Sequence, residues 1–221
     1  GYNTHMRDFL IILMCGLYVV LEAFIAFLGK RFGFLKGEGN RKFIHMATSL
    51  LIFPVVYMIE NPLLRLVGPS VFIVFNFVAS HMGMGRIIGL DDDKRHMGLV
   101  VYPFSVLILV ILVNGGYIAS SSAVTGVLIM GLGDGSAALI GKKWGKHGYR
   151  VSGGGKKSLE GTLSMALVSF LVAITFSPLG IWGSLLVALL SSGVENISPS
   201  GIDNATVPLF AALLTEVLCR L

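Results

Sequence analysis

Long apolar runs recur along the whole chain and constrain its fold more than any other feature. Eight runs approach the length that a helix needs to cross a bilayer, near residues 9–29, 41–59, 63–82, 97–113, 116–141, 159–176, 179–194 and 204–220. Of the 221 residues, 54% are hydrophobic and only 13% are charged, which is too apolar for an ordinary soluble domain. We therefore expect an all-α, polytopic membrane helical bundle of about eight transmembrane helices. The seventh run is short enough to be tilted or re-entrant instead.

No Pro/Ser-rich linker or sustained charge run divides the chain, so we expect a single domain over residues 6–221. Residues 1–5, GYNTH before Met6, have the character of an expression-tag remnant. Cys15 and Cys219 lie in apolar runs near opposite ends of the chain. Small packing residues explain these cysteines better than a disulfide or a catalytic thiol does.

The basic residues are distributed unevenly between the two sets of connections. Those after the first, third and fifth runs hold fourteen of the seventeen Lys and Arg residues, and the others are Arg7, Arg65 and Arg220. The positive-inside rule then predicts an integral multi-pass membrane protein with both termini outside and the long polar loops in the cytoplasm. The membrane would be the cell membrane in a prokaryote, or that of the endoplasmic reticulum or plastid in a eukaryote. Topology and phosphate binding explain the net charge of +5 better than nucleic acid does, because no aromatic-interleaved basic surface is present.

The most polar stretch covers residues 131–162 and reads GLGDGSAALIGKKWGKHGYRVSGGGKKSLEGT. Glycines let backbone amides approach an anion, lysines supply positive charge, and a carboxylate such as Asp134 can hold a cation or accept a proton. The combination predicts a site for a nucleotide or another polyphosphate. A carboxylate that is merely paired with a neighbouring lysine is the alternative for Asp134.

The start of the sixth run is a second candidate for phosphate binding. Lys156, Lys157, Ser158, Glu160 and Thr162 straddle it, and the free amides of a helix N-terminus attract anions. Ordinary capping by Ser158 and Glu160, with the lysines as interfacial anchors, is the alternative.

Two further segments carry candidate residues. Arg41, Lys42 and His45 fall on neighbouring turns of one helix face, where they could bind phosphate or orient a base; interfacial anchors and a satisfied interior histidine are the alternative. Glu195 and Asp203 bracket a turn rich in Pro and Gly and could share a divalent cation with Asp134. A solvated loop with Asp203 as a helix cap would explain the same pattern.

Other acidic residues carry weaker signals. Asp91, Asp92 and Asp93 are consecutive, so their carboxylates should point in different directions, and a solvated loop explains them better than a metal site. Glu22 and Glu216 are candidate functional residues only because burying a charge within an apolar membrane span costs free energy.

Four of these motifs occur in an order that resembles the phytol, dolichol and polyprenol kinase family of CTP-dependent lipid kinases. They are RKFIH at 41–45, GLGDGSAALIGKKWGKH at 131–147, GKKSLEGT at 155–162 and ENISPSGIDNATVPL at 195–209. The resemblance covers residues 39–209 and implies transfer of the terminal phosphoryl group of CTP to a long-chain isoprenoid alcohol, with Mg²⁺ or another divalent cation.

The resemblance also implies roles for individual residues. The expected catalytic residues are Asp134, His45, Lys157 and Glu160, and His45 or one of the carboxylates would accept the proton of the alcohol. The expected metal ligands are Asp134, Glu195 and Asp203. The expected nucleotide-binding residues are Arg41, Lys42, Gly133, Gly135, Lys142, Lys143, Lys146, Lys156, Ser158 and Asn204.

Three rival functions share some of these features. The central motifs are similar to those of CTP:phosphatidate cytidylyltransferases, but the Pro-Gly-His-Gly-Gly and Asp-Arg-x-Asp patterns of those CDP-lipid synthases are missing from the C-terminal stretch. A CTP-dependent diacylglycerol kinase shares the same motifs and stays open. A transporter or channel fits poorly, because no inverted repeat is visible and the ionisable residues cluster at one membrane face.

Overall fold

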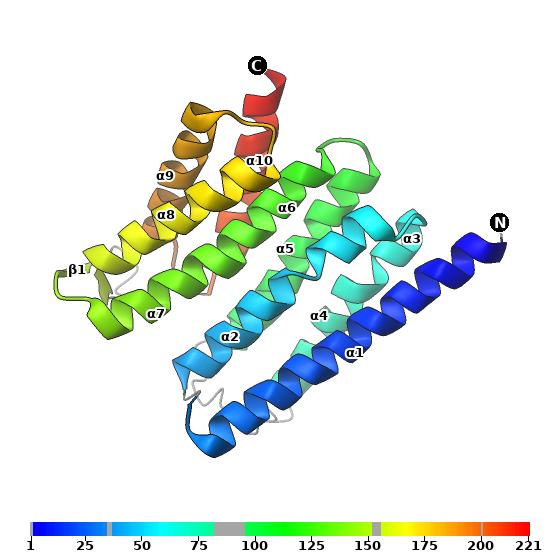
Figure 1. Cartoon of the computed structure of the whole chain (residues 1–221), viewed down its shortest axis with the longest axis horizontal. Coiled ribbons are helices and arrows are strands. Elements are labelled where there is room, and N and C mark those ends of the chain that lie inside the picture. Colours follow the sequence, from blue (N-terminus) through cyan, green and yellow to red (C-terminus); the bar gives the residue numbers. More distant parts are fainter. Residues whose placement is uncertain (1, 35–36, 82–95, 152–155, 200) are drawn as a thin grey trace.

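The computed structural model describes residues 2–34, 37–81, 96–151, 156–199 and 201–221, which form a bundle of helices with one short hairpin (Figure 1). In chain order the elements are α1 (Tyr2–Phe32), α2 (Glu38–Ser49), η1 (Pro54–Met58), α3 (Pro62–Arg65), α4 (Val67–His81), α5 (His96–Asn114), α6 (Ser120–Leu128), η4 (Ile129–Asp134), α7 (Gly135–Trp144), β1 (Gly148–Arg150), β2 (Lys156–Ser158), α8 (Leu159–Phe176), α9 (Ile181–Ile197) and α10 (Asp203–Arg220).

The all-helical prediction is confirmed for the described residues, apart from the hairpin. In that part of the chain four helical segments are long and apolar enough to cross a membrane: Thr4–Phe32, Pro62–Ala79, Ser120–Trp144 and Leu159–Phe176. Val100–Asn114 and Ile181–Ile197 are shorter apolar helices. A helix satisfies its own backbone hydrogen bonds, as hydrocarbon surroundings require. The count of about eight spans stays a prediction.

Large apolar side chains cover the outer surface of the bundle. Phe9 and Leu17 on α1 are 61% and 62% exposed, and Phe75 on α4 is 55% exposed. Soluble proteins rarely expose contiguous apolar surface of this kind. The outer helices are therefore suited to contact lipid.

The central element is the continuous helix formed by α6, η4 and α7, drawn in green across Figure 1 between α2 and α8. In the most apolar 18-residue window of this helix, 67% of the window is buried, compared with 17% of the corresponding window in α1. Its apolar side chains form the middle of the hydrophobic core together with residues of α5, α8 and α10, among them Leu109, Val124, Leu128, Ile129, Met130, Met165 and Val207.

Glycines allow the neighbouring helices to approach this central helix closely. A Cβ atom added to Gly126 would lie 2.3 Å from the backbone oxygen of Pro208 on α10. At Gly131 the added atom would lie 2.3 Å from Cβ of Ser49 on α2. Small residues at such crossings are typical of helix packing in membranes.

A π-helical turn, η4, interrupts the central helix and ends at Asp134. Such a turn changes the register of the residues that follow it, and these turns often lie at functional sites. The carboxylate of Asp134 consequently belongs to a segment packed against α2 on one side and α8 on the other.

Two of the predicted apolar runs each form two helical segments. The run at 41–59 forms α2 and then the π-helical turn η1, which begins at Pro54, because proline has no N–H to continue a helix. The run at 63–82 forms α3 and α4. Pro62 starts α3, and the side chain of Asn61 accepts a hydrogen bond from the Leu63 N–H at 2.9 Å.

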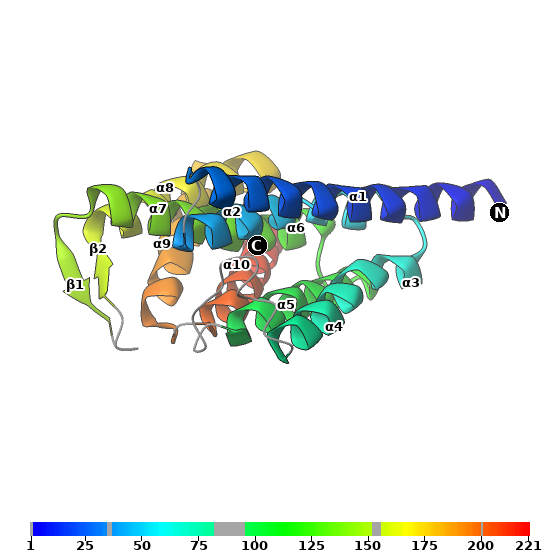
Figure 2. The ribbon, with the colours of Figure 1, turned by 90° about the horizontal axis from the view of Figure 1, so that it is seen from below.

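Sequence patterns did not predict the hairpin between α7 and α8, which Figure 2 shows projecting from one end of the bundle. Its strands β1 and β2 are antiparallel and pair Tyr149 with Lys157. The Leu159 N–H donates to the His147 carbonyl at 3.0 Å and closes the base of the hairpin. The apolar pattern missed these strands because each has only three residues.

Candidate functional site

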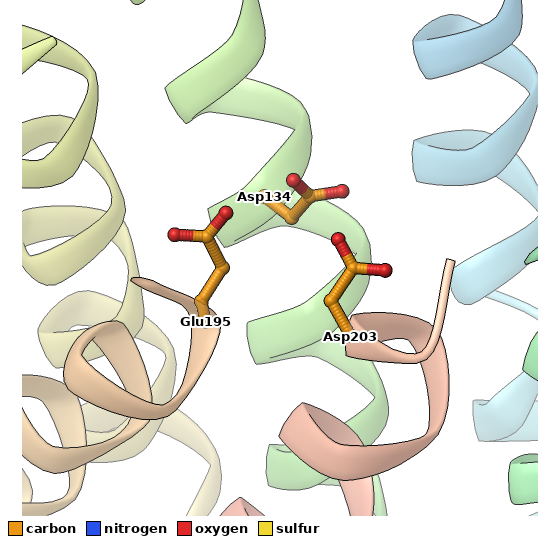
Figure 3. A group of neighbouring side chains, drawn as sticks. All are labelled: Asp134, Glu195 and Asp203. Carbon is orange, nitrogen blue, oxygen red and sulfur yellow. The ribbon is translucent and has the colours of Figure 1, made fainter. Parts of the chain in front are cut away.

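Three carboxylates from separate elements converge beside the central helix. Asp134 ends η4, Glu195 lies in the last turns of α9, and Asp203 is the first residue of α10. One carboxylate oxygen from each residue lies within 4.8 Å of the others. Figure 3 shows the three side chains as neighbours. Asp134 and Glu195 are each only 6% exposed. We call these three residues the acidic cluster.

Two lysines compensate the negative charge of the acidic cluster. Nζ of Lys42, a buried residue on α2, contacts Oδ2 of Asp134 in an ion pair. Nζ of Lys157, on β2, lies 2.6 Å from Oε1 of Glu195 and also donates to the Glu195 carbonyl at 2.7 Å. Buried carboxylates need such partners, since desolvation of an unpaired charge costs several kcal/mol.

The turn before α10 orients the third carboxylate. Oδ1 of Asp203 accepts hydrogen bonds from the N–H groups of Gly201 and Asn204, both at 2.9 Å. Gly201 has a φ of 93°, a conformation that glycine adopts without steric cost. Asp203 thus stabilises its own turn, although the N-cap position of α10 is Ile202 and not Asp203, and it also belongs to the acidic cluster.

His45 lies one turn after Lys42 on α2. Its ring packs on that of Tyr102, with 4.2 Å between the ring centroids. Its Nε2 atom is buried and has no hydrogen-bond partner among the residues that the structure describes. Buried polar atoms nearly always have a partner, so this nitrogen marks a position where a ligand could bind.

The donor set of the acidic cluster suits a hard divalent cation. Mg²⁺ and Ca²⁺ prefer carboxylate oxygens, and three of them converge here from three elements. Two ammonium groups lie beside the same carboxylates and could contact phosphate oxygens. The arrangement can therefore bind a phosphorylated ligand together with a cation.

The expected open turn of backbone amides around Asp134 is absent from residues 131–135, which continue a helix. Close packing explains the two flanking glycines instead. A Cβ atom at Gly133 would lie 3.0 Å from Oγ of Ser169, and one at Gly135 would lie 2.4 Å from Cγ of Met46.

Ser158 and Glu160 have structural partners. Oγ of Ser158 caps α8 by accepting the Gly161 N–H at 3.1 Å. Oε1 of Glu160 lies 2.8 Å from Nδ1 of His147, at the base of the hairpin. The Ser158 contact matches the capping alternative, whereas Glu160 binds His147 instead of capping α8. Glu160 is not a member of the acidic cluster.

The remaining lysines lie near the hairpin rather than in the acidic cluster. Lys142 and Lys143 are exposed at the end of α7, Lys146 is exposed between α7 and β1, and Lys156 is exposed on β2. Nζ of Lys143 lies 4.5 Å from the centroid of the Trp144 ring. These side chains are free to reach a ligand that arrives from this end of the bundle.

Tyr149 joins the hairpin to two helices, and sequence reasoning missed it. Its hydroxyl contacts Oγ1 of Thr162 on α8 and donates to Oδ1 of Asn196 on α9 at 2.8 Å. Asn196 follows Glu195 directly, so this contact helps to hold β2 and Lys157 beside the acidic cluster. A single aromatic residue within a polar segment was the only signal in the sequence.

The other acidic candidates lie elsewhere. Oε1 of Glu22 accepts a hydrogen bond from Thr48 at 2.6 Å. Glu216 binds the Ala119 N–H at 2.7 Å and pairs with Arg220 at 2.8 Å, which gives it a structural role between α10 and α6. Asp91, Asp92 and Asp93 lie outside the described residues.

Comparisons with known proteins find similar lipid kinases. The chain is 41% identical over 136 residues to a phytol kinase from Synechocystis sp., an alignment that covers 57% of this chain and 56% of the relative. It is 30% identical over 200 residues to the dolichol kinase EVAN of Arabidopsis thaliana, covering 79% of this chain and 34% of the relative. It is 28% identical over 194 residues to the dolichol kinase sec59 of Schizosaccharomyces pombe, an alignment that covers 80% of this chain and 35% of the relative.

The chain spans about half the length of the phytol kinase and about a third of the length of these dolichol kinases. No protein-family model matches the chain, and no solved structure matches it.

Proposed function

We propose that the chain is a CTP-dependent lipid kinase. Its relatives support kinship with the phytol, dolichol and polyprenol kinase family. It transfers the terminal phosphoryl group of CTP to the hydroxyl of a long-chain isoprenoid alcohol. The observation that carries the proposal is the convergence of Asp134, Glu195 and Asp203 with Lys42 and Lys157. Phosphoryl transfer depends mainly on positioning and charge neutralisation, and these side chains supply both.

The proposal includes the topology. About eight helical segments cross the membrane, and the acidic cluster opens at the cytoplasmic end of the bundle. The hairpin and the α9–α10 turn lie at that end, whereas both termini lie at the other (Figure 1). This arrangement would let a water-soluble nucleotide and a membrane-bound alcohol meet at one surface.

Each group has a defined task in the proposed reaction. Asp134, Glu195 and Asp203 would hold Mg²⁺, which when bound neutralises charge on the phosphate oxygens. Lys42 and Lys157 contact the phosphates, and the exposed lysines near the hairpin attract the nucleotide from solution. Arg41 and Asn204 each adjoin a residue of the site along the chain, Lys42 and Asp203 respectively.

His45 accepts the proton of the alcohol in this scheme. Its Nε2 atom has no partner in the described part of the chain, whereas Asp134 and Glu195 are already paired with lysines. The alcohol oxygen attacks the terminal phosphorus of CTP, the bond from that phosphorus to the bridging oxygen breaks, and CDP leaves. The hydroxyl proton moves to Nε2 of His45.

Purified protein with γ-labelled CTP, Mg²⁺ and a panel of phytol, polyprenol, diacylglycerol and phosphatidate tests this function. We expect a labelled isoprenoid monophosphate together with CDP. Release of pyrophosphate and formation of a CDP-lipid would instead identify a cytidylyltransferase, and exclusive use of diacylglycerol would identify the other kinase. The assay repeated with ATP tests the choice of donor.

The Asp134→Asn variant tests the site. It keeps the side-chain size but removes the charge, so we expect the rate to fall at least about 100-fold, as when one electrostatic contact to a transition state is lost. Glu216→Gln removes a carboxylate that binds Ser122 and Arg220 away from the site, and this control should retain activity. Undiminished phosphorylation by Asp134→Asn would contradict the proposed role of Asp134.

A further inference from the structure

A partly open cavity of about 320 Å³ lies between α1, α2, α4 and α5. Apolar side chains provide most of its lining, including Val19 on α1, Phe72 and Phe75 on α4, and Val106 on α5. Glu22 and Thr48, which bind one another, form a polar pair in its wall. Cavities of this size and character are typical of sites for small apolar ligands.

The polar end of this cavity adjoins the acidic cluster. Arg41, His45 and Asn204 contribute to its lining. Arg41 precedes Lys42, the partner of Asp134, and Asn204 follows Asp203, so both residues connect the cavity wall to the cluster. His45 lies in the same wall, and its buried Nε2 atom has no hydrogen-bond partner among the described residues. An amphiphile in the cavity would therefore have its polar group beside the phosphoryl-transfer site.

We propose that this cavity holds the hydroxyl-proximal part of the hydrocarbon chain of the acceptor alcohol, with the hydroxyl at His45 and the chain between α1 and α4. This assignment rests on the proposed function and adds where the acceptor binds. The cavity lies near the lower limit of ligand-pocket volumes, so a long polyprenyl chain extends beyond it into the surrounding lipid. Selection among acceptor alcohols then depends on the branching and saturation of their first isoprene units rather than on their total chain length.

Two glycines leave open space in the walls of the cavity. Gly16 on α1 and Gly68 on α4 both line it, and a Cβ atom added to either meets no other atom within 4 Å. A larger side chain at either position can therefore project into the cavity without striking the backbone. Gly16→Leu and Gly68→Leu fill the cavity from opposite walls.

Steady-state kinetics with phytol as the acceptor provide the first test. We expect each leucine variant to raise the KM for phytol at least about tenfold, the scale on which a pocket registers one or two methylene groups, and to leave the KM for CTP unchanged. Leu17→Trp is the matched control, because Leu17 is the next residue on α1, is 62% exposed and is not part of the lining. Melting temperatures verify that all three variants fold.

Unchanged phytol kinetics in both folded leucine variants would overturn the assignment.

Binding is tested separately from turnover with a phytol analogue that carries a photoreactive diazirine near its hydroxyl. We expect crosslinks in wild-type protein on α1, α2 and α4 residues of the cavity, with fewer crosslinks in Gly16→Leu. Crosslinks confined to the outward face of α1 would contradict the cavity assignment even if kinase activity is present. A wild-type protein that crosslinks in the cavity but phosphorylates no alcohol would contradict the proposed function and not the binding site.

Discussion

At the scale of single residues, the two ion pairs of the site join segments that are far apart in sequence. Lys42 and Asp134 are separated by 92 positions, and Lys157 and Glu195 by 38. In each pair both side chains are largely buried. Removal of one partner leaves the other charge without compensation, which costs more than removal of both. The pairs therefore contribute to stability as well as to the proposed chemistry.

A double-mutant cycle on Lys157 and Glu195 should separate these two contributions. We expect Lys157→Met to lower the free energy of unfolding by about 3 kcal/mol, because it leaves the Glu195 carboxylate buried and unpaired. The double variant Lys157→Met/Glu195→Gln should recover part of that loss, as measured by thermal unfolding in detergent. Phosphorylation should stay low in the double variant. Full recovery of activity together with stability would show that the pair is only structural.

At the scale of the elements, close crossings of helices position the site. The central helix contacts α10 through Gly126, and it contacts α2 through Gly131 and Gly135. These contacts bring Asp134, Lys42 and Asp203 together, because each of them belongs to one of the three elements that meet. The glycines near Asp134 thus act on the site through packing.

Substitution of Gly126 tests this packing. A Cβ atom there would lie 2.3 Å from the Pro208 oxygen and 2.8 Å from Cβ of Ala212, so Gly126→Ala must separate α6 from α10. We expect a loss of about 2 kcal/mol in the free energy of unfolding, within the range for overpacked cores, with a matching fall in melting temperature.

Gly193→Ala is the matched control for Gly126→Ala. Gly193 lies on α9, where an added Cβ atom meets nothing within 4 Å. Alanine favours the helix at such a position by about 0.5–1 kcal/mol, so this variant should melt at the same temperature or higher. Equal melting temperatures for Gly126→Ala and wild type would refute the role given to the α6–α10 crossing.

At the scale of the whole molecule, the bundle separates its chemistry from its termini. The N-terminus, the C-terminus and the α5–α6 connection lie away from the hairpin (Figure 1). Arg220 reinforces that end by donating to the Tyr117 carbonyl at 2.6 Å. The described residues with the richest chemistry, in the hairpin and the α9–α10 turn, lie at the opposite end.

Labelling of cysteines from one side of the membrane tests the proposed orientation. With Cys15 replaced by serine, the exposed Cys219 should react with an impermeant maleimide added to intact cells. A Lys146→Cys variant that lacks both native cysteines should react only after permeabilisation, because Lys146 lies at the hairpin end. Labelling of both positions from the same side would contradict the topology.

The sequence alone determined the general character of the protein. Apolar length and the distribution of Lys and Arg are local properties, and they predicted the helical membrane class and the polar segments that could share one face. The order of four motifs pointed to the lipid kinase family that the relatives support. The grouping of Asp134, Glu195 and Asp203 also agrees with the structure, since Asp134 lies near the end of one predicted run, Glu195 follows another and Asp203 precedes a third.

Only the tertiary structure decided how these residues are paired and what surrounds them. It assigned Lys42 to Asp134 and Lys157 to Glu195, gave Ser158 and Glu160 structural partners, and placed Gly133 and Gly135 in a helix. It also formed the cavity beside His45, with Gly16 and Gly68 in its walls. Such features depend on distances between helices, which result from packing over the whole bundle. An apolar cavity wall and a lipid-facing surface use the same residue types, so no local pattern distinguishes them.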